Sequence, residues 1–268
     1  MTEISRDQPP GFQTVDHPGA QVLSRMEVTP WVRYILESGE ELHGVAGADR
    51  DVFALEGRAP VYVIPAKLPR NHKGQAATRW AVRRFVRGGR LLPKLLGDRY
   101  LRTGTPRPFH EAMVSDAARE RGVPTPRVMA AAVYWDGPFY RGDLVTEFVP
   151  DAPDLVEALF DTRRKGAGGA LERMQALRAS GALVRTMASA GLQHRDLNAS
   201  NILLQWKGTA PQGMILDLDL SRLYPAGTPA ALGPMARRLE RSLRKWEGHT
   251  GLRLSEREWR TLRGAMEE

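Results

Sequence analysis

One short stretch of the sequence concentrates the residue types that phosphoryl transfer requires. From His194 onward it is H-R-D-L-x-x-x-N, followed directly by Ile-Leu-Leu. Transfer of a phosphoryl group needs a carboxylate that orients the attacking hydroxyl and oxygen ligands for a cation that neutralises phosphate charge. The pattern predicts Asp196 as the catalytic base and Asn201 as one of the metal ligands.

A second acidic position follows at a spacing that fits the same chemistry. Asp217, in the sequence I-L-D-L-D, lies sixteen residues after Asn201. Pairing of strand Ile202–Gln205 with Met214–Leu216, across a turn at 208–213, would bring Asn201 and Asp217 to one end of a hairpin. Mg²⁺ prefers few protein oxygens combined with phosphate oxygens. Asn201 and Asp217 are therefore predicted to bind Mg²⁺.

Each of these residues taken alone has a structural explanation. A single Asn or Asp beside a strand is usually a turn former. The order and spacing of Asp196, Asn201 and Asp217 together favour a kinase. We expect His194 to be a packed structural residue. An arginine at the position of Arg195 can bind a phosphorylated activation segment, but no such segment is recognisable, so we expect Arg195 to hold local structure.

The preceding half of the chain supplies candidates for binding ATP. In kinases a basic residue on the third strand contacts the nucleotide phosphates, and a carboxylate on the following helix pairs with that basic residue. A hinge is expected at Thr146–Val149, where backbone groups would hold adenine. A poor glycine-rich loop begins at Gly57. The predicted ATP-binding residues are Gly57, Arg83, Glu111, Glu147 and Phe148.

The predicted elements segregate along the chain, with strands first and helices later. A helix is expected over Phe109–Arg121, among the strands, and a long helix over Leu171–Ala190. Five strands are expected, at 51–55, 61–64, 80–86, 128–135 and 140–148. Because strands and helices do not alternate, this order predicts α+β architecture rather than repeated βαβ units.

The predicted fold is protein-kinase-like and two-lobed, with a five-stranded N-lobe carrying one helix and a mostly helical C-lobe. Residues 1–25 are polar with scattered Pro and Gly, and are expected to be loosely ordered. The N-lobe is expected at 26–146 and the C-lobe at 147–268, together forming one kinase-like domain.

The positive charge is concentrated in one segment of this 268-residue chain. Between Arg79 and Arg107 lie eight arginines, Lys94 and a single acid, Asp98, so this segment carries the whole net charge of +8. Such a segment suits an anionic partner such as phosphate groups, nucleic acid or a lipid surface. Equally, it could be a solvated arginine-rich face.

Several segments resemble the signature of the 3-deoxy-D-manno-octulosonic acid (Kdo) kinases, in the lipopolysaccharide kinase family. The chain differs at Ala59, Ser200 and Leu218, where the family pattern has glycine, histidine and phenylalanine. The similar segments are R-F-V-R-G-G at 84–89, K-L at 94–95, D-R-Y at 98–100, G-V-P-T-P at 122–126, D-L-V-T-E at 143–147, D-L-N-A-S-N-I-L-L at 196–204 and L-D-L-D at 216–219.

The resemblance implies transfer of the ATP γ-phosphate to the 4-hydroxyl of Kdo in the lipopolysaccharide inner core. It implies a Kdo-bearing lipid A precursor as acceptor and peripheral attachment to the cytoplasmic face of the inner membrane. Phosphates and Kdo carboxylates would suit the basic segment. The residues proposed to dock on this anionic glycolipid are Arg87, Arg90, Lys94, Arg99 and Arg102.

Composition agrees with a protein that remains in the cytoplasm. The chain has no cysteine, which excludes disulfides and thiolate metal sites. The first residues include acids and no apolar stretch, so no secretory signal is expected. No run approaches the ~18 apolar residues that a membrane span requires. Only 51 residues follow Asp217, without an A-P-E-type element, so a peptide-substrate platform is not expected.

Two alternatives to this function stay open. The acceptor could be another small hydroxylated substrate, such as a core heptose or an aminoglycoside, although a polycationic aminoglycoside calls for an acid-rich site. The chain could be a non-catalytic ATP-binding adaptor, against which the complete set of Asp196, Asn201 and Asp217 argues. Nucleic acid is not an expected partner, because no aromatic platform is interleaved with the arginines.

Overall fold

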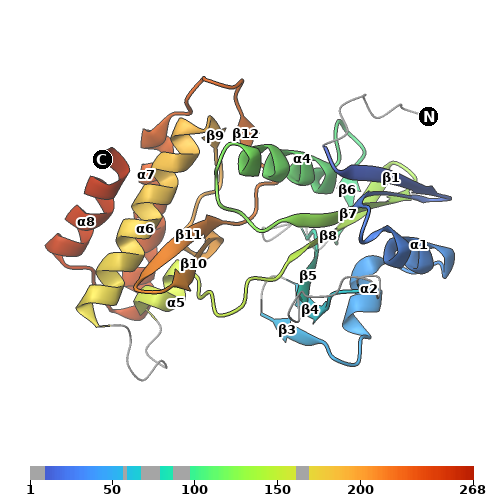
Figure 1. Cartoon of the computed structure of the whole chain (residues 1–268), viewed down its shortest axis with the longest axis horizontal. Helices are drawn as coiled ribbons and strands as arrows, with labels where there is room; N and C mark the ends of the chain where they lie inside the picture. The colour runs from blue at the N-terminus through green and yellow to red at the C-terminus, as the bar shows by residue number, and fades with distance from the viewer. Residues whose placement is uncertain (1–9, 57–58, 68–78, 87–96, 161–168) are drawn as a thin grey trace. The chain divides into compact units, whose positions relative to one another are not determined.

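The computed structural model describes residues 10–56, 59–67, 79–86, 97–160 and 169–268 (Figure 1). Contacts divide the chain into two compact units. The N-terminal unit comprises Met1–Asp116 and Arg127–Phe148, and the C-terminal unit comprises Ala117–Pro126 and Val149–Glu268. The sequence places the division after residue 146 and does not anticipate that the short segment Ala117–Pro126 joins the second unit.

An antiparallel sheet organises the N-terminal unit. Its strand order is β1-β2-β7-β8-β5-β4-β3, with β6 paired to β8 (Figure 1). The described residues thus form eight strands in this sheet rather than five. The strands are β1 (Phe12–His17), β2 (Ala20–Arg25), β3 (Phe53–Leu55), β4 (Val61–Pro65), β5 (Arg79–Arg84), β6 (Tyr100–Leu101), β7 (Val128–Asp136) and β8 (Phe139–Glu147).

The expectation of a loosely ordered N-terminus is wrong for residues 12–25. These residues form the β1–β2 hairpin, turned at Gly19, which has a left-handed φ of 79°. β2 also pairs with β7, and Val22 is fully buried. No local pattern reveals the hairpin, because β1 is largely polar and β2 is held in the sheet by β7, which lies more than a hundred residues away.

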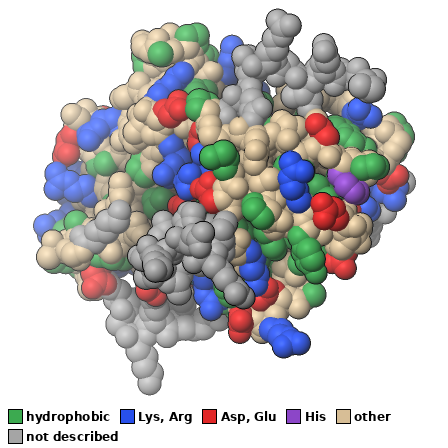
Figure 2. Space-filling view, turned by 45° about the vertical axis from the view of Figure 1, so that its right-hand side comes forward, with side chains coloured by type: hydrophobic (Ala, Val, Ile, Leu, Met, Phe, Trp, Pro, Cys, Tyr) green, Lys and Arg blue, Asp and Glu red, His purple; other side chains and the backbone are tan. Residues whose placement is uncertain are grey.

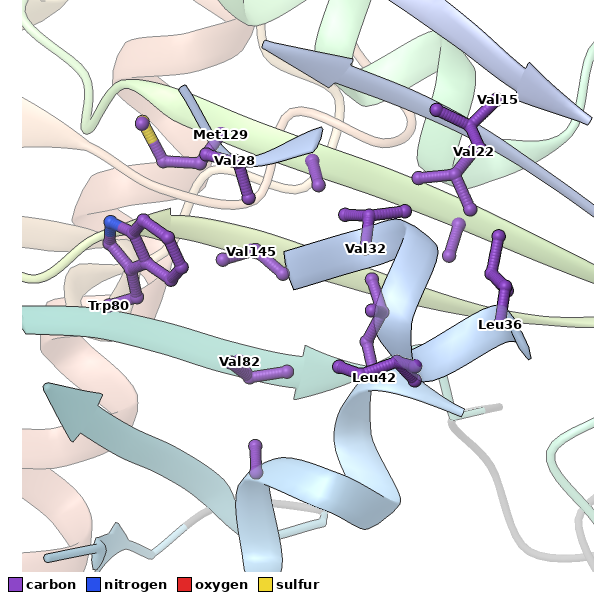
Figure 3. Close-up of a cluster of buried hydrophobic side chains, with 14 of the residues drawn as sticks. Val15, Val22, Val28, Val32, Leu36, Leu42, Trp80, Val82, Met129 and Val145 are labelled. Atoms are coloured by element: carbon purple, nitrogen blue, oxygen red, sulfur yellow. The ribbon is translucent and has the colours of Figure 1, made fainter. Parts of the chain in front are cut away.

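Side chains alternate between the two faces of the sheet along each strand, and apolar side chains on each face pack against helices. Trp80, Val82 and Val145 pack in a cluster with two helices that the sequence analysis does not predict, α1 (Thr29–Glu37) and α2 (Leu42–Gly47) (Figure 3).

The other face carries the helix α4 (Arg107–Glu120), close to its predicted bounds. Phe109 and Ala112 of α4 pack there with Phe85 and Leu144. Arg83, next to Val82 on β5, therefore lies on the α4 face.

The C-terminal unit is built around the helix α6 (Ala170–Ser189), one residue shifted from its prediction. Gly181 of α6 permits close approach of α8, because a Cβ there would lie 2.5 Å from the Leu262 carbonyl oxygen. After α6, two further helices, α7 and α8, complete the unit. The other elements are α5 (Leu155–Phe160), β9 (Leu192–Gln193), the 3₁₀ helix η1 (Ala199–Asn201), β10 (Ile202–Lys207), β11 (Ala210–Ile215), β12 (Arg222–Leu223), α7 (Leu232–Thr250) and α8 (Glu256–Glu267).

None of the described helices is both long and apolar enough to cross a membrane.

Candidate active site

His194 connects the predicted catalytic loop to the end of β11. Its side chain is buried, with Nδ1 accepting a hydrogen bond from the Asp196 amide at 3.2 Å and Nε2 donating to the Leu216 carbonyl at 3.1 Å. Burial lowers the pKa of His194, which favours the neutral ring that this pair of bonds requires. The contacts agree with the structural role expected for this residue.

Asp196 presents its carboxylate on an exposed loop while its backbone is held in place. The Asp196 carbonyl accepts hydrogen bonds from Nδ2 of Asn198 at 3.1 Å and of Asn201 at 3.4 Å. Within the described part of the chain, the carboxylate itself makes no ion pair or hydrogen bond. A fixed backbone with an open carboxylate is what a base that orients an incoming hydroxyl requires.

Asn201 and Asp217 lie at one end of the β10–β11 hairpin, as the spacing predicts. Ile202 pairs with Ile215, and the Leu216 amide donates to the Asn201 carbonyl at 2.8 Å. Asp217 follows directly and adopts a left-handed backbone with φ of 61°. Such a conformation is uncommon outside glycine and concentrates at functional sites. The hairpin therefore brings together the two predicted metal ligands.

Helix α7 supports the loop from behind. The Ala199 amide donates to Oγ of Ser242 at 3.0 Å, and the His194 amide contacts Sδ of Met235 at 3.4 Å. Both acceptors are on α7. Sequence reasoning does not identify Ser242 or Met235, because a contact over some forty residues leaves no local pattern.

The donor set at the hairpin end fits Mg²⁺ bound mainly through phosphate. The described residues contain no group of three or more His, Cys, Asp or Glu that could hold a metal. Asn201 uses Nδ2 toward Asp196, so its Oδ1 is the atom left for a cation. One amide oxygen and one carboxylate match a hard ion that takes few protein ligands and completes its shell with phosphate and water.

In the N-terminal unit, the predicted pair of Arg83 and Glu111 is present. Nη2 of Arg83 donates to Oε2 of Glu111, and the guanidinium lies 4.4 Å from the centre of the Phe85 ring. The Glu111 side chain is 5% exposed and that of Arg83 is 27% exposed. A largely buried partner holds the guanidinium in one orientation, unlike the average surface ion pair.

The predicted hinge is anchored to the sheet. The Glu147 amide donates to the Arg127 carbonyl and the Phe148 amide to the Arg79 carbonyl, both at 2.9 Å. The Phe148 ring meets the ring of Phe53 edge-on, with centroids 5.6 Å apart. Sequence reasoning assigns no role to Phe53. The available signal is a partly exposed aromatic on the edge strand that leads into the Gly57 loop.

Four of the predicted residues, Gly57, Arg87, Arg90 and Lys94, lie outside the described residues. The two described docking candidates both contact the β7–β8 hairpin. Arg99 forms an ion pair with Asp136 at 3.2 Å, and Arg102 lies 4.2 Å from the centre of the Trp135 ring.

A buried ionic cluster joins β5 to β8 on the sheet face opposite Arg83. Nε of Arg84 donates to Oδ1 of the fully buried Asp143 at 3.0 Å, and the His43 amide donates to Oδ2 at 2.9 Å. Glu41 accepts from both Arg84 and Arg141. Burial raises the pKa of Asp143 despite the adjacent guanidinium. No local sequence pattern marks this cluster, whose contacts help to fix the register of the strand carrying Arg83.

Comparison with known proteins shows which family the chain is similar to. The model of the Lipopolysaccharide kinase (Kdo/WaaP) family matches residues 70–265. A 3-deoxy-D-manno-octulosonic acid kinase from Vibrio cholerae is 33% identical over 170 residues, which span 63% of this chain and 66% of that protein. A 3-deoxy-D-manno-octulosonic acid kinase from Actinobacillus succinogenes is 33% identical over 187 residues, spanning 68% and 72%. The chain thus spans slightly under two thirds of the first relative and somewhat more of the second.

A solved structure described as WaaP in complex with acyl carrier protein shares the fold. It superimposes with a TM-score of 0.54 over 91% of this chain and 88% of that chain, at 16% identity. The predicted two-lobed, kinase-like α+β fold is confirmed. The chain belongs to the lipopolysaccharide kinase (Kdo/WaaP) family and is a phosphotransferase that acts on a hydroxyl group.

Proposed function

We propose that this protein transfers the γ-phosphate of ATP to the 4-hydroxyl of Kdo in the inner core of lipopolysaccharide. The observation that carries the proposal is the arrangement of Asp196, Asn201 and Asp217 around the end of one hairpin. The family match and the names of the relatives support Kdo as the acceptor sugar.

Asp196 is the proposed base. Its carboxylate orients the Kdo hydroxyl and accepts its proton as the new bond from oxygen to the γ-phosphorus forms. The bond between that phosphorus and the bridging oxygen of ADP breaks in the same step, and ADP leaves with the bond electrons. His194 keeps the loop in position and does not titrate in the reaction, because its Nε2 proton is engaged by a backbone carbonyl.

The nucleotide is held by residues that the sequence predicts. Arg83, oriented by Glu111, is assigned the contact to the phosphates, and Asn201 with Asp217 would hold Mg²⁺. Bound Mg²⁺ would neutralise the charge on the phosphates. The remaining proposed contacts to ATP are Gly57, Glu147 and Phe148. Because the ring of Phe53 contacts that of Phe148, Phe53 is added as a proposed neighbour of the adenine ring.

The proposed acceptor is a Kdo-bearing lipid A precursor, reached by peripheral contact with the cytoplasmic face of the inner membrane. Cationic side chains near an anionic lipid surface provide reversible attachment. The residues proposed from the basic segment are Arg87, Arg90, Lys94, Arg99 and Arg102.

A comparison of acceptors tests the proposal. Purified protein is incubated with γ-labelled ATP, Mg²⁺ and a lipid A precursor that either carries or lacks Kdo, and the products are located by mass spectrometry. We expect a single phosphate on O4 of Kdo and no product from the Kdo-free precursor. No phosphate on the Kdo-bearing precursor, or phosphate on a sugar other than Kdo, would overturn the assignment and favour another sugar kinase or an adaptor.

A further inference from the structure

Helix α7 exposes a row of cations that the proposed reaction does not use. At 3.6 residues per turn, four exposed basic residues fall within an arc of about 100° around the helix axis. The opposite side of the helix buries Met235, Leu239 and Leu243 in the C-terminal unit. We call the row the α7 basic stripe, and its members are Arg237, Arg238, Arg241 and Lys245.

The acids of α7 do not compensate this charge. Glu240 accepts a hydrogen bond from Nε of Arg263 at 2.9 Å, and Glu247 accepts from the Leu254 amide at 2.7 Å. Both acids lie outside the arc and are engaged by other partners. No member of the stripe forms an ion pair or a side-chain hydrogen bond with another described residue. Four positive charges are therefore available to an external anion.

The stripe differs from the mixed surface elsewhere. On the face drawn in Figure 2, basic side chains are interspersed with acidic ones. The described members of the basic segment are also engaged, Arg99 with Asp136 and Arg102 with the Trp135 ring. The side chains of the α7 basic stripe are thus exposed, aligned on one helix and without a partner among the described residues, whereas Arg99 and Arg102 each have one.

We propose that the α7 basic stripe docks the enzyme on the phosphate groups of an anionic lipid surface. The inference rests on the proposed function, because a lipid-linked phosphoglycolipid acceptor requires the enzyme to work at such a surface. Each Lys or Arg close to an anionic membrane strengthens binding about fivefold, so four aligned cations are enough for reversible attachment.

The side chains beside the stripe favour lipid headgroups over other polyanions. Within the arc, the other exposed residues are Pro234 and Gly248, and the exposed side chains that flank it are Arg244 and His249, so the stripe has no large apolar anchor. Specific protein interfaces centre on such anchors, and single-stranded nucleic acid requires aromatic stacking. The ring of His249 packs edge-on against Trp246, which is half-buried and lies outside the arc.

Sedimentation with vesicles tests the proposal. Vesicles of phosphatidylcholine with and without about a third of phosphatidylglycerol are mixed with the full chain at increasing salt. The test variant carries Arg237→Glu, Arg241→Glu and Lys245→Glu. The matched control carries Arg33→Glu, Arg50→Glu and Arg178→Glu, which changes the net charge equally at three scattered exposed sites.

We expect wild type to bind the anionic vesicles in a salt-dependent manner, and the stripe variant to bind them at least tenfold more weakly. The control should lose no more than about threefold, because its cations are not aligned on one face. Equal losses in the two variants would overturn the proposal. Polyglutamate serves as a second probe. If the stripe variant loses binding to it while keeping vesicle binding, the stripe binds acidic polypeptides instead.

A water-soluble, deacylated acceptor separates this proposal from the proposed function. The stripe variant should phosphorylate a deacylated Kdo-containing acceptor at the wild-type rate, since α7 contacts the loop through its other side. Failure of wild type on that acceptor would contradict the Kdo assignment while the vesicle result still stands. A loss of vesicle binding together with equal loss on the soluble acceptor would indicate general damage and overturn the stripe assignment.

Discussion

At the scale of single residues, the chemistry is decided by side chains whose backbones are fixed by unrelated contacts. Asp196 keeps an open carboxylate because its amide and carbonyl are held by His194, Asn198 and Asn201. The sequence predicts Asp196 and Asn201 because their spacing is local. It does not predict the left-handed backbone of Asp217, which depends on how β11 ends.

The pair of Arg83 and Glu111 allows a quantitative test of nucleotide binding. We expect Arg83→Gln to raise the KM for ATP about tenfold, because a charge-assisted contact to phosphate is lost. Glu111→Gln should raise the KM for ATP by a similar factor, and the double variant by little more, since the residues act as one unit. Arg99→Gln in the same unit serves as the control. Additive effects would indicate that Glu111 does not orient Arg83.

Asp217 allows a test of metal dependence. We expect Asp217→Ala to bind ATP with the same weak affinity in the presence and absence of Mg²⁺, because the carboxylate that holds the cation is removed. Calorimetric titration with ATP, with and without Mg²⁺, measures this directly. Wild type should bind more tightly with Mg²⁺. A variant that retains the wild-type Mg²⁺ enhancement would exclude Asp217 as a ligand.

Asp154 is predicted to make stability depend on pH. Its carboxylate caps the start of α5 by accepting from the Glu157 amide at 2.8 Å, and burial raises its pKa from 3.8 to about 6. Between these two values the folded protein binds more protons than the unfolded chain, so stability falls as pH rises. Asp154→Asn keeps a capping side chain but removes this titration.

We therefore expect the free energy of unfolding of Asp154→Asn, measured relative to that of wild type, to increase as the pH is raised from 4 to 7. Urea unfolding of both proteins at each pH measures the difference. A difference that stays constant across this range would show that the carboxylate of Asp154 titrates normally in the folded protein.

At the scale of elements, the sequence predicts those with a strong local pattern and misses those stabilised from afar. The helix α6 and the start of β10 are predicted almost to the residue, because alternation and helical periodicity are local signals, whereas β11 begins four residues earlier than predicted and the turn is correspondingly shorter. The helices α1 and α2 are missed because they are short and their stability comes from packing on Trp80 and Val82.

Close packing of α6 against α8 gives a prediction about glycine. Gly181→Ala should lower the melting temperature, because its Cβ would overlap the Leu262 carbonyl oxygen, and overpacking costs about 1–3 kcal/mol. Gly264 of α8 has open space around its Cβ position, so Gly264→Ala should instead stabilise by about 0.5–1 kcal/mol. Calorimetric melting of both variants measures the two effects. Equal melting temperatures would contradict the close approach of the helices.

At the scale of the whole molecule, charge is informative only once it is placed on the fold. The sequence count assigns the net charge of +8 to Arg79–Arg107 and leaves the remainder neutral. That sum hides the α7 basic stripe, because acids elsewhere in the chain cancel its charge numerically. The two acids of α7 itself, Glu240 and Glu247, are outnumbered by its basic residues and are engaged by Arg263 and the Leu254 amide, so the stripe keeps its positive charge locally.

Turnover of Asp196→Asn is the measurement that tests the account most directly. Transfer from γ-labelled ATP to the Kdo-bearing lipid A precursor is timed for wild type and variant, and the affinity for ATP with Mg²⁺ is measured on the same samples. Loss of a positioned base predicts a turnover lower by roughly 10²–10⁴, with affinity for the nucleotide unchanged. Turnover close to that of wild type would contradict the assignment of Asp196, and with it the proposed mechanism.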